Sequence, residues 1–530
     1  MIFLKETILN KLQDNPIVQQ MLQFGNNIGN LLPNEEALCL ASAFMQDKQT
    51  RIVVKKNRYE AQQLYQRLKP LINDTLLFVM EESLRVQAIA SSPEDKQEQL
   101  YVLTQLVKED KPRIIICNTA SFFRYLPDKE LFRNLCFKFE VDQEITMTEL
   151  KQKLNRAGYT KVNYVDRPCT YASRGGIVDV YCLEYDHPIR IEFFDTVIES
   201  IRIFHEETQR TIETIDSVLI NPATDLLFTD DQIEYLQKEI DSELEKQQAK
   251  LIQDDYDFLL DYIEKDKISI ENYDIDPHLY IYFSYLNANK LTDYVNGHII
   301  FSSQEEVESG YKKLNEETIS FIQEMVESHQ YLPKYGMFHD IFTFEKEHTI
   351  QMFHDFLDFK HPIFSKIETL EKSDQPLIQI LENLKGENIY ISLDDEHTKK
   401  VQEALKAYSI HRNITFIEDD FYEGFTYEDI SVYTQQELFH HPSQIKRYQK
   451  TFKQGQILQN ILELEPNDYV VHEQYGIGQY VGITTRKIKG KTLDYLHVLY
   501  NGGDELFVPL SQFQLVRKYV SKEGVGIKLS

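Results

Sequence analysis

The first 119 residues alternate short, uninterrupted apolar runs with helical segments, and this pattern restricts the fold more than any other feature of the chain. Strands are predicted at residues 51–54, 76–79 and 113–117, and a helix is predicted to begin at Tyr59. Strands of a parallel sheet are covered by helices on both faces, so they read as continuous apolar runs rather than as alternating ones. Residues 1–119 are therefore predicted to form a parallel α/β domain.

The pattern changes over residues 120–210, which predict a compact α+β module. A helical segment around residues 150–157 precedes three short strands, and glycine and proline pairs separate the strands. Such pairs are typical of turns between strands. The predicted strands lie at residues 162–165, 177–181 and 189–194.

The rest of the chain divides into four further segments. Residues 211–345 are acidic and largely helical in pattern, and they are interpreted as a continuation of the first domain. Residues 346–443 predict a small α/β domain, and residues 444–465 predict a linker helix. Residues 466–530 contain short strands at close spacing with glycine turns between them, which favours a small β barrel. The predicted fold class is thus multidomain, with α/β and α+β parts.

The formal net charge of −28 is concentrated in one part of the chain. Residues 211–460 hold 22 basic and 48 acidic residues, a balance of −26, whereas the other 280 residues together contribute −2. An acidic surface repels the phosphate backbone of nucleic acids. We therefore expect little or no DNA binding by this chain.

Composition also bears on location and on metal sites. No window approaches 18 uninterrupted apolar residues, so no membrane partner is expected. The five cysteines include no Cys-x-x-Cys pair, which favours a reducing cytoplasm, and the fifteen histidines show no metal-ligand spacing. We expect a cytoplasmic protein with no metal site.

Two segments superficially resemble nucleotide-binding motifs. Gly490-Lys491-Thr492 has Thr485 five residues before Gly490, where a phosphate loop needs glycine, and it lies between two predicted strands. It is interpreted as a hairpin turn. The acidic run at residues 394–397 is interpreted as a helix N-terminus, where carboxylates meet free N–H groups. With no catalytic constellation visible, no catalytic residue, no cofactor and no enzymatic activity are predicted for this chain.

Residues 154–223 carry the first specific resemblance. The ordered runs resemble the module that the excision-repair protein UvrB shares with bacterial transcription-repair coupling factors, and in that family the module binds UvrA. The runs are AGY at 157–159, YASRGGIVDVY at 171–181, IRIEFFD at 189–195, IESIRIF at 198–204, TQR at 208–210 and NPA at 221–223.

Residues 466–517 carry the second resemblance, and residues 82–94 are also similar to the first domain of coupling factors. The runs DYVVH at 468–472, YGIGQYVGI at 475–483, DYL at 494–496 and LFVPL at 506–510 resemble the CarD-like domain with which coupling factors bind the β subunit of RNA polymerase. Both modules on one chain, in this order, identify it as similar to the N-terminal part of a coupling factor.

The resemblance implies a UvrB-like, degenerate helicase-type first domain with the α+β module inserted, and an SH3/Tudor-like barrel at the C-terminal end. It implies recognition of RNA polymerase stalled at DNA lesions and recruitment of nucleotide excision repair through UvrA. The family's ATP-dependent DNA translocase, with its ATP and magnesium, is expected in a segment beyond Ser530, so the chain is interpreted as a fragment. The alternatives are a UvrB-type DNA-damage ATPase, which the missing phosphate loop disfavours, and a free-standing regulator built on the barrel.

The family pattern places the UvrA-binding surface on Arg174, Lys161, Arg167 and Tyr181. Arg174 matches the arginine before the glycine pair, Lys161 matches a basic position of UvrB, and Tyr181 matches an aromatic position. At Ala172 UvrB has another arginine, so weaker affinity is expected here. Buried pairing of the arginines with aspartates of the module is the structural alternative. The family pattern also implies that this surface is hidden until the motor engages, so a chain ending at Ser530 is expected to bind UvrA constitutively.

The polymerase-binding surface is predicted on the strand at residues 480–486, whose hairpin partner is predicted at residues 493–500. An exposed edge strand presents unpaired N–H and C=O groups that a strand of the partner can complete. Ile483, Thr485 and Arg486 are the predicted contacts with the polymerase β subunit, and the alternative is that these side chains face the barrel core.

Overall fold

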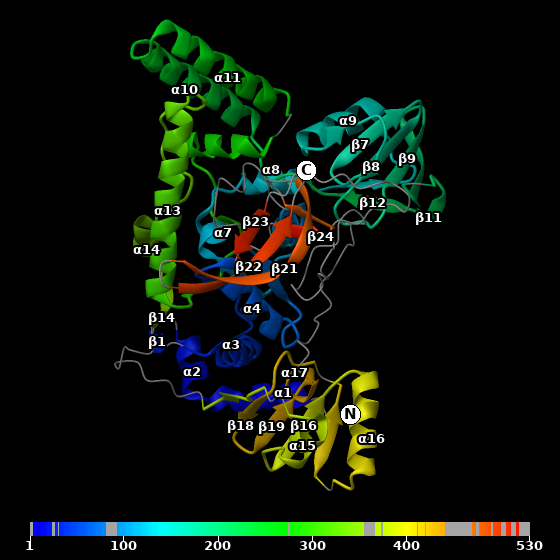
Figure 1. Ribbon diagram of the computed structural model, residues 1–530. Coiled ribbons are helices and arrows are strands. Elements are labelled where there is room, and N and C mark those ends of the chain that lie inside the picture. The colour runs from blue at the N-terminus through cyan, green and yellow to red at the C-terminus, as the bar shows by residue number, and fades with distance from the viewer. Residues whose placement is uncertain are drawn as a thin grey trace. The chain divides into compact units, whose positions relative to one another are not determined.

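The computed structural model divides into two units, Met1–Ile445 and Lys446–Ser530, which are described separately (Figure 1). In the first unit it describes residues 4–23, 27–29, 31–80, 93–206, 208–273, 276–354, 366–372, 375–410, 412–418 and 420–439. In the second unit it describes residues 469–472, 476–488, 491–499, 505–509 and 516–518. The predicted linker helix at residues 444–465 lies outside the described residues.

A six-stranded sheet forms the centre of the first unit, with strand order β1-β14-β13-β2-β4-β3. All five pairings are parallel, which confirms the parallel α/β prediction for the first domain. The strands are β1 (Ile28–Gly29), β2 (Arg51–Lys55), β3 (Thr75–Phe78), β4 (Ile114–Asn118), β13 (His298–Phe301) and β14 (Ile350–His354). Strand β14 lies beyond residue 345, where the sequence places the end of this domain, and still pairs with β13.

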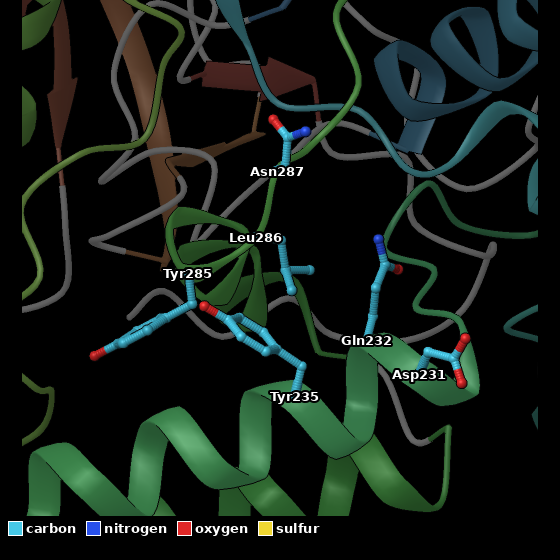
Figure 2. Close-up of a pocket in the computed structure, with 6 residues that line it drawn as sticks. All are labelled: Asp231, Gln232, Tyr235, Tyr285, Leu286 and Asn287. Carbon is cyan, nitrogen blue, oxygen red and sulfur yellow. The ribbon is translucent and has the colours of Figure 1, made fainter.

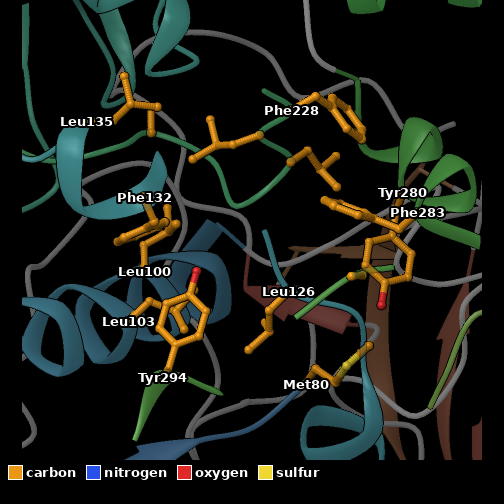
Figure 3. Close-up of a cluster of buried hydrophobic side chains, with 14 of the residues drawn as sticks. Met80, Leu100, Leu103, Leu126, Phe132, Leu135, Phe228, Tyr280, Phe283 and Tyr294 are labelled. Carbon is orange, nitrogen blue, oxygen red and sulfur yellow. The ribbon is translucent and has the colours of Figure 1, made fainter. Parts of the chain in front are cut away.

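Both faces of this sheet are buried, in two separate hydrophobic clusters. Ile52 and Val54 of β2 join one cluster, whereas Val53 between them joins the other, as alternation along a strand requires. Part of the first cluster, with Leu100, Leu126 and the aromatic rings around them, is shown in Figure 3. The helices of this region are α1 (Leu4–Lys11), η1 (Leu12–Asp14), α2 (Pro16–Leu22), α3 (Pro33–Asp47), α4 (Arg58–Leu68), α6 (Pro93–Lys108), α7 (Thr119–Phe123) and α8 (Lys129–Asn134).

The acidic middle of the chain is mainly helical, as predicted. Helices α10 (Asp230–Gln248) and α11 (Gln253–Glu271) pack side by side as a hairpin (Figure 1). The remaining helices of this stretch are η2 (Pro277–Tyr285), α12 (Leu291–Tyr294), α13 (Gln304–Glu327) and α14 (Ile341–Glu347). Within the described ranges, none of the helices combines the length with the apolar run that crossing a bilayer requires.

A second six-stranded sheet has the order β11-β10-β9-β8-β7-β6 and is antiparallel except for the β6–β7 pair. Its strands are β6 (Thr160–Lys161), β7 (Thr170–Arg174), β8 (Ile177–Tyr181), β9 (Ile189–Phe194), β10 (Val197–Phe204) and β11 (Thr211–Ile215). The strand predicted at residues 162–165 is wrong, because the extended pairing ends at Lys161 and the chain continues as a loop. Helix α9 (Met147–Arg156) contributes Leu150 and Leu154 to the core of this module, and β5 (Phe137–Glu140) pairs with β12 (Ser217–Ile220) beside it.

Arg124 connects the first sheet with the end of this module through a buried ion pair. Its guanidinium donates to Asp225 Oδ2 at 2.5 Å and to Gln99 Oε1 at 2.6 Å, and lies 5.3 Å from the centre of the Tyr280 ring. The Arg124 and Asp225 side chains are 5% and 9% exposed. Because both charges are removed from water, each depends on the other for compensation.

Substituting Arg124 by leucine is expected to lower the free energy of unfolding by about 3–5 kcal/mol, because Asp225 would remain buried without a counter-charge. The matched control is Arg156→Leu, which breaks the Arg156–Asp230 pair, whose side chains are 41% and 69% exposed. The control should cost no more than about 1 kcal/mol. Urea unfolding of the three proteins measures both effects, and equal losses would contradict the prediction.

A third sheet has the order β15-β18-β19-β16-β17 and lies within residues 346–443, for which the sequence predicts a small α/β domain. Its elements are β15 (Glu368–Thr369), α15 (Leu377–Glu382), β16 (Asn388–Ser392), α16 (Asp395–Ala407), β17 (Ile414–Ile417), β18 (Phe425–Tyr427), β19 (Ile430–Tyr433) and α17 (Gln435–Phe439). Asp394 caps α16 by accepting the His397 backbone N–H at 2.8 Å, which confirms the helix N-terminus predicted there. The domain shares a hydrophobic cluster with α1 to α4, and Arg67 makes a two-pronged ion pair with Glu423 at 2.7 and 2.8 Å.

The second unit contains a five-stranded sheet with the order β23-β22-β21-β20-β24. Its strands are β20 (Tyr469–His472), β21 (Gly476–Ile488), β22 (Lys491–Leu499), β23 (Glu505–Pro509) and β24 (Val516–Lys518). The strands are where the sequence predicts them, but the described strands do not close into a barrel, so the SH3/Tudor-like barrel is not confirmed.

Candidate partner-binding surfaces

The second sheet has one face packed on the core and one outer face. Tyr171, Val178 and Val180 lie on the packed face and join the large hydrophobic cluster. The register pairs Arg174 with Ile177 and Ala172 with Asp179, so these residues lie on the outer face together. The outer face is therefore the part of the module that can contact a partner.

Arg174 is an exposed cation of this face. It ends β7 and is exposed, and within the described part of the chain it makes no ion pair. The following Gly175 has φ +56°, a backbone conformation that glycine adopts without strain, and a Cβ at Gly176 would stand 3.0 Å from the Phe193 carbonyl oxygen. The glycine pair thus permits the tight β7–β8 turn that positions Arg174 at the end of the sheet.

The neighbouring acidic groups are already engaged by other arginines. Arg190 donates to both carboxylate oxygens of Asp179 at 2.8 and 2.9 Å, and these hydrogen bonds to Asp179 raise the pKa of Arg190. Glu192 accepts from Arg202 and from the Ser200 hydroxyl through its Oε2 atom. The structural alternative for Arg174, buried pairing with Asp179, is therefore not what the structure shows.

The other residues predicted to bind UvrA lie in different environments. Arg167 is exposed in the loop that follows β6, and Val165 of this loop packs on Ala172 of the outer face. Lys161 is exposed, but the register pairs it with Tyr171, a residue of the packed face. The loop that contains Arg167 thus packs on the outer face, whereas Lys161 lies on β6 at the edge of the sheet.

Tyr181 lies on the outer face but is not accessible. It is 8% exposed, packs with Val165 and Ala172, and donates its hydroxyl to the Asp186 carbonyl oxygen at 2.8 Å. Burial raises the pKa of Tyr181 to about 12. Its contacts support the loop that carries Arg167, so its role in this structure is internal packing.

Phe194 is a surface residue that the sequence interpretation missed. It ends β9, lies on the same face as Arg190 by alternation, and is 74% exposed. Phe193 next to it donates its N–H to the Gly176 carbonyl oxygen at 2.8 Å, which brings the end of β9 to the turn beside Arg174. The alternation along this strand could have placed Phe194 on the outer face, because residues 190, 192 and 194 alternate with the buried Ile189 and Ile191.

In the second unit, β21 has an edge that no described strand completes. It pairs with β22 from Gln479 to Ile488, but β20 covers its other edge only from Gly476 to Gln479. The exposed Val481 interrupts the register with β22, which marks a β-bulge. From residue 480 onward, the main-chain groups of the second edge therefore have no strand partner among the described residues.

The three predicted polymerase contacts lie on this part of β21. The register pairs Ile483 with Leu496, Thr485 with Asp494 and Arg486 with Leu493. Their side chains lie outside the described residues, so the strand and its hairpin partner are the parts of the prediction that the structure confirms. Ile488 pairs with Lys491, as the predicted hairpin requires, although Gly490 itself is not among the described residues.

The residues of the first domain do not fit a nucleotide. Helix α3 follows β1 at the carboxyl edge of the parallel sheet, where phosphates bind in related α/β folds. The helix begins at Pro33, which has no N–H, and its first turn contains Glu35 and Glu36. A negative first turn with one donor missing opposes phosphate binding.

A cavity of about 350 Å³ lies at the start of α10. Figure 2 shows its lining, which consists of Asp231, Gln232, Tyr235, Tyr285, Leu286 and Asn287. The lining offers amide and hydroxyl groups with one carboxylate and no basic side chain, so it does not suit an anionic ligand. Within the described residues, no group of three or more potential ligands is placed to hold a metal ion.

Comparison with known families finds two matches on the chain. Residues 137–226 match the family described as the UvrB interaction domain, and residues 464–520 match the CarD-like/TRCF RID domain. The first match contains the second sheet, and the second contains the five-stranded sheet of the second unit. The chain thus combines a UvrB-type interaction module with a CarD-like module.

The curated relatives that match the chain are transcription-repair-coupling factors. The factor of Bacillus subtilis is 29% identical over 518 residues, which cover 90% of this chain and 43% of the relative. Those of Staphylococcus haemolyticus and Staphylococcus epidermidis are 27% and 26% identical and cover 95% and 99% of this chain. The predicted resemblance to the N-terminal region of transcription-repair-coupling factors is confirmed. The chain spans about half the length of the relatives it matches, between 43% and 48%.

Proposed function

We propose that this chain is a two-surface docking protein that connects RNA polymerase with the nucleotide excision repair machinery. The outer face of the second sheet would bind UvrA, and the incomplete edge of β21 would bind the polymerase β subunit. The observation that carries the proposal is that one chain matches both the UvrB interaction domain and the CarD-like/TRCF RID domain.

The chemistry of the outer face supports a protein partner. Arg174 is exposed and lacks an ionic partner among the described residues, while Asp179 and Glu192 nearby are neutralised by arginines of the sheet. The surface beside the β7–β8 turn therefore presents a cation, and Phe194 adds exposed apolar area next to it. Arginine and aromatic side chains contribute most of the binding energy at many protein interfaces. An acidic patch with an apolar pocket on UvrA would complement this face.

The second surface is proposed to bind by strand addition. Main-chain N–H and C=O groups along β21 would form a ladder with an extended segment of the polymerase β subunit. This mode depends on the backbone of β21, whose pairing the structure defines, rather than on individual side chains. We propose further that the second unit completes the SH3/Tudor-like barrel of the CarD-like family, and that the first domain is a degenerate helicase-type domain.

A UvrB-type ATPase is the competing function, and the first turn of α3 argues against it. An ATP-hydrolysis assay on this chain distinguishes the two functions. We expect no hydrolysis above background, and ATP turnover by the purified chain would favour the ATPase.

Substituting Phe194 by alanine is expected to weaken UvrA binding by roughly 1–3 kcal/mol, because the interface would lose an aromatic contact. Because Phe194 is 74% exposed, the free energy of unfolding should change by less than about 0.5 kcal/mol. Titration calorimetry with UvrA, together with urea unfolding, measures both quantities. Tyr235→Ala, at a tyrosine 47% exposed on α10, is the matched control and should leave UvrA binding unchanged. Equal affinity of Phe194→Ala and the unchanged chain would remove Phe194 from the proposed surface.

A further inference from the structure

The carboxyl edge of the first sheet contains a buried carboxylate where nucleotide-binding domains hold a phosphate. Helix α3 begins there, directly after β1, and Glu36 lies in its first turn. The Glu36 side chain is 2% exposed and the Lys55 side chain is 12% exposed. An ionised carboxylate is removed from water at a cost of several kcal/mol unless cations and donors surround it, so its partners define the site.

Two strands supply those partners. Lys55, the last residue of β2, donates from Nζ to Glu36 Oε2 at 2.8 Å. Ser302, which follows β13, donates from Oγ to Glu36 Oε1 at 2.7 Å, and Lys55 Nζ also donates to Ser302 Oγ at 2.6 Å. A lysine and a hydroxyl beside a helix N-terminus are the donor set that recognises phosphate oxygens in α/β domains. Here that donor set is saturated by the chain's own carboxylate.

The start of α3 is closed in a second way. Glu35 accepts the Leu32 backbone N–H at 2.9 Å, and Pro33 contributes no N–H at all. Asn34, the next residue of this turn, is 6% exposed, and its side-chain Nδ2 has no hydrogen-bond partner among the described residues. The first turn of α3 thus contains an unused buried donor.

We propose that Glu36 is a built-in substitute for a phosphate group, which closes the nucleotide position of this domain and joins α3 to β2 and β13. This proposal explains why a domain with a parallel α/β fold has residues that do not suit a nucleotide at this position. Lys55 and Ser302 are donors that could bind an anion at this position, and the Glu36 carboxylate accepts their hydrogen bonds. Removing the carboxylate should leave Lys55 and Ser302 as a vacant anion site.

Phosphate rescue of Glu36→Ala tests the proposal. The variant should have a lower urea unfolding midpoint than the unchanged chain in chloride buffer. Inorganic phosphate, added at constant ionic strength and pH, should raise that midpoint in a saturable way, because a ligand that binds only the folded state stabilises it. The unchanged chain should show no saturable response to phosphate, and it should not bind a fluorescent ATP analogue.

Two further variants show that any response comes from this site. Glu36→Ala combined with Lys55→Met should be insensitive to phosphate, because the cation is gone. Glu306→Ala removes the partner of Lys56, a pair with side chains 37% and 41% exposed, and should not create a saturable response. The proposal is overturned if Glu36→Ala does not respond to phosphate, if it cannot be isolated folded even in phosphate buffer, or if the unchanged chain binds the ATP analogue.

Discussion

Reversing the charge at Arg174 should weaken UvrA binding by roughly 2–5 kcal/mol, since charge reversal at a central interface arginine removes an attraction and adds a repulsion. This range corresponds to a loss of affinity of about 30-fold to several thousand-fold. Arg174 is exposed and unpaired within the described residues, so Arg174→Glu should leave the unfolding midpoint nearly unchanged. Calorimetric titration of UvrA into the variant, or surface-based kinetics, measures the loss.

The matched control for Arg174→Glu is Lys153→Glu. Lys153 is exposed on α9, whose Leu150 and Leu154 join the core on the packed side of the sheet, so the same charge change is made away from the outer face. Lys153→Glu should bind UvrA as the unchanged chain does. An Arg174→Glu protein that unfolds normally and keeps its UvrA affinity would show that UvrA binds elsewhere.

A proline at Thr485 should abolish binding to the polymerase β subunit while UvrA binding persists. Proline removes one main-chain donor from β21, and strand addition depends on such donors. Thr485→Val is the matched control, because it changes the side chain but retains the N–H, and it should keep polymerase binding. A pull-down with the β subunit measures both variants.

The folding of the second unit has to be followed in the same samples. Thr485 is in register with Asp494 of β22, so far-ultraviolet circular dichroism and the unfolding profile of this unit should stay close to those of the unchanged chain. If Thr485→Pro keeps both the fold and the polymerase affinity, the polymerase docks on another surface. Loss of binding in Thr485→Val would show that the side chain, and not the backbone, makes the contact.

Three strands of the first sheet, β2, β3 and β4, could be predicted from sequence because buried strands of a parallel sheet are uninterrupted apolar runs. Residues 52–54 and 114–117 are uninterrupted apolar runs, and the structure places them in β2 and β4. Strand β14 was missed because it lies far along the chain, after an acidic helical stretch. Strand β14 pairs with β13, and hydrophobic periodicity within a segment does not predict which distant strand it pairs with.

The residues proposed to bind UvrA were predicted from the family resemblance, and the structure shows only how exposed they are. The resemblance matches Arg174 to the arginine before the glycine pair, and Arg174 is exposed. Tyr181 was predicted on the surface, but the loop containing Val165 covers it. That coverage follows from a tertiary contact between residues 16 positions apart. Phe194 was missed because an apolar residue at the end of a strand is usually assigned to the core. Its position on the outer face is recognised only when the alternation of the whole strand is considered.

Separate pull-downs of the unchanged chain with purified UvrA and with the polymerase β subunit test the central claim most directly. We predict that each partner is captured on its own, that Arg174→Glu loses only UvrA, and that Thr485→Pro loses only the β subunit. Failure of the unchanged, folded chain to capture either partner would contradict the proposal that it is a two-surface docking protein.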